Sequence, residues 1–298
     1  MMENIEEKMD DACSWRMEWS VCRVCGARNR NKTYRAKEMM YGSREEFDYF
    51  ICDSCKCMQI AHIPEDMGKY YPNMYYSFDK RKNICFEGEG NTENKVLDVG
   101  CGSGEWLLEW AEKGNGNLYG CDPFIKEDIY YGDRVHIKKC EFQEMEGVFD
   151  FIRFGDSFEH MSNPLEVMEC VKRLLKRDGR CQILMPIFPN AAWDVFGINW
   201  YQLDAPRHLC IHSKESMHYL CQKCGLKIDK IVYDSSYWQF LLSYLYTQGI
   251  SFREEAIASS NGFKYEMCGE DIEQFQKASL ECNQKEYGDH AIFDIIHA

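Results

Sequence analysis

The sequence predicts an α/β protein whose sheet follows a cysteine-rich segment and is interrupted late in the chain by a helical insertion. Three patterns support this fold class. An apolar strand at 96–99 leads through a turn with three glycines into a helix that begins near Glu105. Two Cys-x-x-Cys pairs precede that strand. Further short apolar runs, typical of βαβ units, follow at 117–121, 135–137, 149–152, 181–185 and 227–233.

The glycine turn predicts a nucleotide-like ligand. Glycine has no Cβ, so the backbone can approach a ligand closely, and the helix that follows offers unpaired N–H groups. Gly100, Gly102 and Gly104 form G-x-G-x-G, whereas the dinucleotide fingerprint is G-x-G-x-x-G. Asp98, just before the turn, would repel a pyrophosphate but suits the ammonium of a methionine-like group. Asp122, at the end of the next strand, can accept hydrogen bonds from a ribose diol.

The two cysteine pairs predict a structural zinc site. Cys22 and Cys25 form the first pair, and Cys52 and Cys55 form the second after 26 intervening residues. Two such pairs can present four thiolates to one tetrahedral zinc with no open position. Cys57 is a possible substitute for Cys55. Reduced surface thiols and a redox pair are the other interpretations of this pattern.

The glycine turn, both aspartates and the run 174–180 resemble the class I S-adenosylmethionine-dependent methyltransferases over roughly residues 95 to 232. The resemblance implies a Rossmann-like sheet of seven strands, with strand seven antiparallel, and S-adenosylmethionine as cofactor. It places the three glycines at the methionine end of the cofactor and Asp122 at the ribose. It also places Glu141 at the adenine and Asp156 in the cleft between cofactor and acceptor. Arg153 interrupts the apolar strand four, and we expect it at the exposed end of that strand.

The last apolar run, 291–296, is interpreted as strand seven, so residues 235–289 become a mainly helical insertion that could form a lid or a homodimer surface. Its expected helices are 238–246 and 270–285. The predicted division of the chain is an acidic tail (1–20), a zinc-binding module (21–65), an aromatic connecting segment (66–94), a cofactor-binding domain (95–234 plus 290–298) and the insertion (235–289).

The zinc module and the segment 200–213 resemble methyltransferases of sugar and surface-polysaccharide pathways, including deoxysugar C-methyltransferases. That resemblance implies a sugar, nucleotide-sugar or glycan acceptor and makes His208 the candidate general base. Pro206 and Arg207 flank His208 where the family has other residues, which leaves O-methylation open. Arg207 could bind a phosphate or carboxylate, or form a surface salt bridge. His160, just after strand four, is the second candidate base because a histidine titrates near neutral pH.

Composition limits the other function classes. The net charge of −14 disfavours nucleic acid as a partner, because phosphates are held by lysine and arginine. No apolar run is long enough for a membrane span, and the 17 cysteines without an export signal favour a cytoplasmic protein with reduced thiols. A zinc-module RNA methyltransferase and a non-catalytic protein that binds S-adenosylmethionine are the alternatives to a small-molecule methyltransferase.

Overall fold

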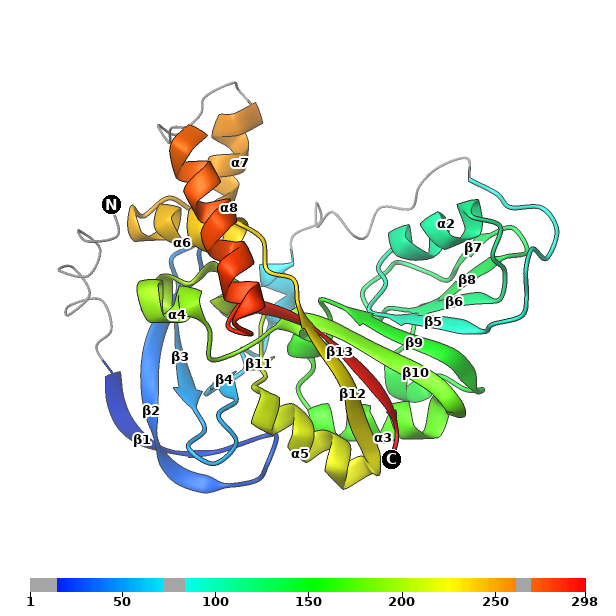
Figure 1. Cartoon of the computed structure of the whole chain (residues 1–298), viewed down its shortest axis with the longest axis horizontal. Coiled ribbons are helices and arrows are strands. Elements are labelled where there is room, and N and C mark those ends of the chain that lie inside the picture. Colours follow the sequence, from blue (N-terminus) through cyan, green and yellow to red (C-terminus); the bar gives the residue numbers. More distant parts are fainter. Residues whose placement is uncertain (1–14, 72–83, 261–268) are drawn as a thin grey trace. The chain divides into compact units, whose positions relative to one another are not determined.

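The computed structural model describes residues 15–71, 84–260 and 269–298 (Figure 1). The start of the predicted tail, residues 72–83 of the connecting segment and residues 261–268 of the insertion lie outside this description. The chain divides into two compact units. The first comprises Met1–Tyr70, Pro186–Met217 and Val232–Ala291, and the second comprises Tyr71–Met185, His218–Ile231 and Ile292–Ala298.

The first unit contains a five-stranded antiparallel sheet in the order β1-β2-β3-β4-β11. Strand β1 lies partly inside the predicted tail, where apolar and polar residues alternate as in a strand. The turns between β1 and β2 and between β3 and β4 carry the two cysteine pairs. The strands are β1 (Trp15–Val21), β2 (Arg28–Lys37), β3 (Glu46–Ile51), β4 (Met58–Ile60) and β11 (Cys210–Ile211).

Helices pack with this sheet around an apolar core that includes Tyr49, Met58, Trp200 and Phe240. Residues of α4, α6 and α8 contribute to this core. Helices α6, α7 and α8 lie in the predicted insertion and gather together in Figure 1. The α-helices are α4 (Ala191–Phe196), α6 (Trp238–Thr247), α7 (Phe252–Ser260) and α8 (Gly269–Gln284). Short 3-10 turns are η1 (Met67–Tyr70), η4 (Gly197–Asn199) and η5 (Tyr201–Leu203).

The second unit is built on a mixed sheet in the order β12-β13-β10-β9-β5-β6-β8-β7. The sheet has eight strands, so the predicted count of seven is wrong. The additional strand is β7, a three-residue edge strand that pairs antiparallel with β8. The strands are β5 (Val96–Val99), β6 (Leu118–Cys121), β7 (Ile129–Tyr131), β8 (Val135–Lys138), β9 (Phe149–Gly155), β10 (Leu175–Pro186), β12 (Leu226–Tyr233) and β13 (His290–His297).

The central strands β10, β9, β5, β6 and β8 are parallel, so their carboxyl ends meet at one edge. Backbone hydrogen bonds flank β12 and β13 at both ends, from Asp234 to His290 and from Ala298 to Gly225. Since the start of one strand is bonded near the end of the other, these two strands run in opposite directions. The last apolar run of the chain therefore lies inside the sheet, between β12 and β10.

Helices cover both faces of this sheet, with α2 on one face and α3 and α5 on the other in Figure 1. They are α2 (Glu105–Glu112), α3 (Pro164–Leu174) and α5 (Lys214–Cys224), with 3-10 turns η2 (Phe142–Glu144) and η3 (Phe158–His160). The core beneath α2 includes Val96, Leu107, Leu118 and Ile137. Among the described residues, no helix combines the length and the apolar character needed to cross a membrane.

Candidate active site

A cavity of 540 Å³ opens in the second unit, at the carboxyl ends of β5, β6 and β9. This volume lies in the range of small-molecule sites, and the position is where parallel α/β sheets bind ligands. Five of the seven predicted cofactor-binding residues line the cavity: Asp98, Gly100, Asp122, Glu141 and Asp156. Gly102 and Gly104 are not among its lining residues.

The glycines of the turn are needed for close packing as much as for a ligand. Gly100 has a φ of +71°, and a Cβ on it would stand 2.6 Å from the Cβ of Ser157. Gly104 has a φ of +87°, and its Cβ would stand 2.4 Å from Cδ1 of Ile137. Gly104 precedes the first residue of α2, so a side chain there would push the helix off the sheet. The predicted ligand contact of Gly104 stays a prediction, because packing alone explains this glycine.

Asp122 ties the glycine turn to the next strand. Its Oδ2 accepts a hydrogen bond from the backbone N–H of Gly102 at 2.9 Å, and its Oδ1 accepts one from that of Phe124 at 2.8 Å. Burial raises the pKa of this carboxyl above its ordinary value. Each carboxylate oxygen can accept more than one hydrogen bond, so Asp122 can hold the loop and still accept from a ribose hydroxyl.

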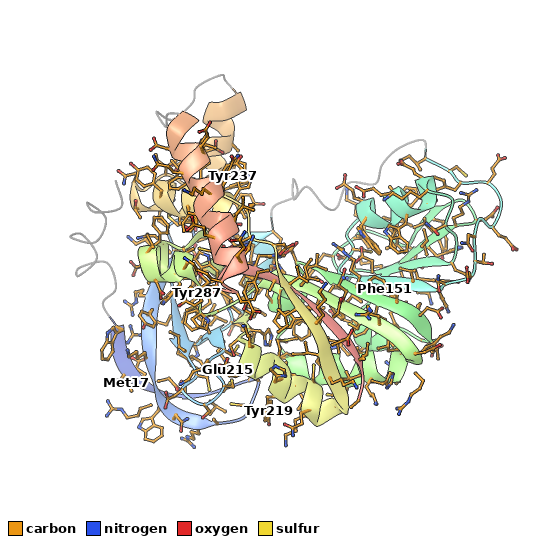
Figure 2. The ribbon with its side chains drawn as sticks, viewed as in Figure 1. Met17, Phe151, Glu215, Tyr219, Tyr237 and Tyr287 are labelled. Atoms are coloured by element: carbon orange, nitrogen blue, oxygen red, sulfur yellow. The ribbon has the colours of Figure 1, made fainter. Side chains whose placement is uncertain are left out.

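Asp98 and Arg153 form an ion pair inside the cavity, which corrects the expectation that Arg153 lies at an exposed strand end. Nη1 of Arg153 is 3.1 Å from Oδ1 of Asp98, and their side chains are only 17% and 4% exposed. The guanidinium lies 4.7 Å from the ring centroid of Trp106, and this ring is stacked with that of Phe151 at a centroid distance of 6.2 Å. Phe151, on β9, is labelled in Figure 2. Burial raises the pKa of Asp98 to about 6 despite the nearby guanidinium.

The cavity is strongly acidic. Its lining carboxylates belong to Asp98, Glu105, Glu109, Asp122, Glu141 and Asp156. Burial raises the pKa of Glu141, and the carboxylates of Glu144 and Asp122 add to this effect. Asp156 has a φ of +51°, a left-handed conformation that is uncommon outside glycine and marks a constrained turn after β9. A cationic ligand fits this lining, whereas a diphosphate would be repelled.

His160 lines the same cavity, at the end of the η3 turn. Its Nδ1 is 3.3 Å from the hydroxyl of Tyr71, and its Nε2 is 3.9 Å from the buried carboxylate of Glu159. A histidine held between a hydroxyl and a carboxylate is suited to accept a proton. Tyr71, Ser157 and Trp106 also line the cavity but were not predicted from the sequence. The position of Trp106 in the first turn of α2, directly after the glycine turn, is the signal that could have identified it.

His208 belongs to the first unit and is nearly buried there. Its Nδ1 is 2.7 Å from the carbonyl of Gln202, and the hydroxyl of Tyr49 donates to its backbone carbonyl at 2.8 Å. Its role as a base stays a prediction, since these contacts also suit a structural histidine.

Arg207 is neither a ligand-binding group nor part of a surface salt bridge. Its side chain is 1% exposed and is paired with the carboxylates of Asp204 and Glu38. Another of its nitrogens donates to the carbonyl of Tyr70 at 3.2 Å. A buried guanidinium between two carboxylates holds three segments of the first unit together, and removing one partner would leave an uncompensated charge.

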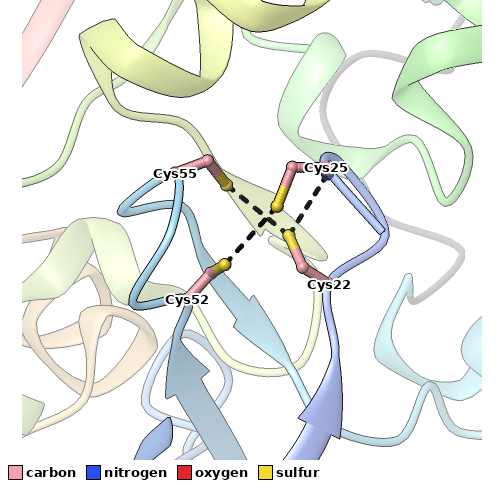
Figure 3. A group of neighbouring side chains, drawn as sticks. All are labelled: Cys22, Cys25, Cys52 and Cys55. Carbon is pink, nitrogen blue, oxygen red and sulfur yellow. Dashed lines mark hydrogen bonds between the residues drawn. The ribbon is translucent and has the colours of Figure 1, made fainter. Parts of the chain in front are cut away.

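The four cysteines of the two Cys-x-x-Cys pairs converge on one point (Figure 3). Their sulfur atoms all lie within 4.8 Å of one another, and the Cys22–Cys55 and Cys25–Cys52 sulfurs are 3.6 Å apart. Each pair sits in a tight turn that ends in a left-handed residue, Gly26 in the first and Lys56 in the second. Side-chain hydrogen bonding by Cys22 lowers the pKa of Cys52 and raises that of Cys55.

This geometry fits a tetrahedral metal. A tetrahedron with Zn–S bonds of about 2.3 Å has sulfur–sulfur edges of about 3.8 Å, close to the two 3.6 Å separations. The amide of Gln59 lies 3.1 Å from the sulfur of Cys22, and a donor of this kind stabilises a metal-bound thiolate. All four cysteines belong to the first unit, so the candidate metal site lies within that unit.

Comparison with known proteins assigns the chain to a protein family. A family model described as a methyltransferase domain matches residues 73–231, more than half of the chain. No curated protein matches the chain in sequence.

Solved structures with a similar fold are distant in sequence. The geranyl diphosphate C-methyltransferase of Streptomyces coelicolor A3(2) has a TM-score of 0.45 and 13% identity, over 71% of this chain and 75% of that one. The magnesium protoporphyrin IX methyltransferase of Synechocystis PCC 6803 has a TM-score of 0.42 and 13% identity, over 70% and 75%. An O-methyltransferase of a Brevibacillus brevis trans-AT PKS multienzyme has a TM-score of 0.41 and 12% identity, over 69% and 67%. At these scores the neighbours carry no argument about the acceptor.

Proposed function

Since the chain belongs to the methyltransferase-domain family and is an S-adenosylmethionine-dependent methyltransferase, we propose that its acceptor is a small molecule of the sugar, nucleotide-sugar or glycan class. The acceptor proposal rests on the resemblance of the cysteine module and of the segment around His208 to sugar-pathway enzymes. It is a separate claim from the cofactor, and it is tested separately.

The observation that carries the cofactor site is the acidic cavity at the glycine turn. S-adenosylmethionine carries its electrophilic methyl on a sulfonium, which joins the adenosyl group to the methionine part. The methionine part carries an α-ammonium. We assign the ribose hydroxyls to Asp122, the adenine to the region of Glu141 and the ammonium to Asp98. The lining carboxylates attract such a cation.

His160 is the candidate base that the structure supports best, because it lines the cavity itself. The hydroxyl of Tyr71 lies 3.3 Å from its Nδ1 and the carboxylate of Glu159 lies 3.9 Å from its Nε2, and the negative charge of that carboxylate would stabilise the protonated imidazole. An acceptor hydroxyl must be held in line with the methyl and lose its proton. His208 remains the base proposed from the resemblance, and the two histidines are separable by mutation.

We also propose that the four cysteines hold one zinc ion with a structural role. All four positions of a tetrahedral ion would be filled by thiolates, so no open position remains for catalysis. The ion would fix the two turns that join β1 to β2 and β3 to β4, because its binding free energy adds to the stability of the fold that brings the four ligands together.

One observation favours RNA as a second candidate acceptor. On one face of β1 the apolar side chains of Trp15, Met17 and Trp19 are 51%, 40% and 68% exposed. On β2, Lys32 and Arg30 pair with Met17 and Trp19 and are exposed on the same face. Exposed aromatic rings beside cations are typical of single-stranded nucleic acid binding. The acidic cavity and the net charge of −14 argue against this candidate.

The deciding experiment is a transfer assay with methyl-labelled cofactor against nucleotide-sugars, oligosaccharides and a mixed RNA pool. We expect label in the sugar-containing fractions and none in RNA. Label in RNA alone would replace the proposed acceptor class with the second candidate. The His160→Gln variant, run in parallel, shows whether the labelled product depends on the cavity.

A further inference from the structure

The ion pair between Asp98 and Arg153 is built into the sheet. β5 and β9 are parallel neighbours, and Asp98 and Arg153 are direct partners in their register. Gly155 makes room for the guanidinium, because a Cβ at that position would stand 2.1 Å from Nη1 of Arg153. The ring of Trp106 lies 4.7 Å away and supports the cation. The guanidinium is therefore fixed in place before any ligand arrives.

Arg153 brings a positive charge to a cavity whose other charged lining residues are mostly acidic. Six lining residues carry carboxylates, and among the described lining residues Arg153 alone is an arginine or lysine. A ligand that matches this arrangement has mainly positive charge and a single anionic group. The amino-acid end of S-adenosylmethionine has this character, with an α-ammonium and an α-carboxylate on the same carbon. The adenine and ribose carry no anion that would need the guanidinium.

We infer that Asp98 and Arg153 together bind the zwitterionic end of the cofactor, with Arg153 holding the carboxylate and Asp98 holding the ammonium. This inference rests on the proposed cofactor site. A guanidinium has five N–H donors and a carboxylate has about four acceptor positions. The two side chains can therefore keep their bond at 3.1 Å and each bind the opposite charge of the ligand. Before binding, each neutralises the other, and the remaining titratable groups among the described lining residues include five carboxylates and His160.

Binding calorimetry with three ligands tests the inference. S-adenosylhomocysteine carries both charged groups, its decarboxylated analogue carries only the amine, and 5′-methylthioadenosine carries neither. Arg153→Met should weaken binding of S-adenosylhomocysteine by about 10- to 100-fold, the range expected for a charge-assisted hydrogen bond. The same variant should change the affinity for the other two ligands by less than about threefold. Arg153→Lys keeps the charge without the planar fork and should recover part of the loss.

Arg180→Met is the matched control. Arg180 lies on the neighbouring strand β10 and pairs with Asp294, but it does not line the cavity. Its replacement should leave all three affinities unchanged. If Arg153→Met does not fold, Arg153→Lys with the same three ligands still gives the ratio of affinities that decides the question.

The outcomes separate two failures. If wild-type protein binds neither S-adenosylhomocysteine nor 5′-methylthioadenosine, the proposed cofactor site is wrong. If wild-type protein binds both and Arg153→Met weakens them equally, Arg153 supports the fold and does not bind the carboxylate. Unchanged binding of S-adenosylhomocysteine to Arg153→Met would also overturn the inference while leaving the proposed function standing.

Discussion

Replacing Asp98 by asparagine should make the protein more stable and at the same time poorer at binding its cofactor. Asp98 is 3% exposed, and burial raises its pKa from the ordinary 3.8 to about 6. Because the folded state holds this proton more tightly than the unfolded state, ionisation of Asp98 destabilises the fold. The penalty is absent below pH 3.8, grows between 3.8 and about 6, and is complete above that range.

The size of the effect follows from the same two values. A difference of one in pKa corresponds to about 1.4 kcal/mol, so full ionisation of Asp98 lowers the free energy of unfolding by about 3 kcal/mol. Asparagine resembles the neutral acid and avoids this loss. The free energy of unfolding of Asp98→Asn should therefore exceed that of wild type by about 3 kcal/mol at pH 7.5 and by about 1 kcal/mol at pH 4.5. S-adenosylhomocysteine should bind it more weakly, because the charge that meets the ammonium is gone.

Urea unfolding without cofactor, at both pH values, measures the first effect, and calorimetry measures the second. Asp150→Asn is the control, and it should change the free energy of unfolding in the opposite direction, making the protein less stable at pH 7.5. Although burial opposes it, a hydrogen bond from Lys176 lowers the pKa of Asp150. This carboxylate therefore adds stability above its unfolded pKa and loses it as the pH falls. An Asp98→Asn protein that is less stable than wild type at pH 7.5, or whose advantage is the same at both pH values, would refute the reasoning.

Three further predictions concern the other residues of the sites. Asp122→Ala should weaken binding of S-adenosylhomocysteine at least tenfold, measured by calorimetry; unchanged affinity would remove Asp122 from the ribose site. Elemental analysis should find about one zinc per chain, and Cys55→Ala should lose it; a folded wild-type protein without metal would contradict the zinc proposal. His160→Gln should lower kcat by about 10²- to 10⁴-fold with cofactor affinity nearly unchanged. If His208→Gln shows that pattern and His160→Gln does not, the base is His208.

The sequence predicts most of the elements because the apolar runs are long and well separated. The helices predicted at 238–246 and 270–285 correspond to α6 (Trp238–Thr247) and α8 (Gly269–Gln284), and the last apolar run forms β13. The four-cysteine cluster was predictable because two Cys-x-x-Cys turns impose their own local geometry. Strand β7 was missed because it has only three residues, follows two acidic residues and has an exposed Tyr130 at its centre.

Arg153 and Arg207 show where the sequence is insufficient. Arg153 looks misplaced in an apolar strand until the register of β5 and β9 brings it beside Asp98. Arg207 looks like a surface cation, but its partner Glu38 is 169 residues away in the chain. In both cases a charge is made stable by a partner from a distant segment. Local pattern contains no information about such a pairing, whereas it contains most of the information about a turn or a strand.

The acidic lining of the cavity affects cofactor binding and the rate of methyl transfer in different ways. Methyl transfer removes the positive charge of the sulfonium, so carboxylates close to the sulfur would stabilise the reactant more than the transition state and would slow the reaction. The ammonium keeps its charge throughout, so a carboxylate directed at the ammonium strengthens binding without this penalty. Asp98, fixed beside Arg153, suits that task. Rate enhancement must then come from orientation of the acceptor and from removal of its proton. Variants of Asp98 should accordingly act on cofactor affinity, and variants of His160 should act on turnover.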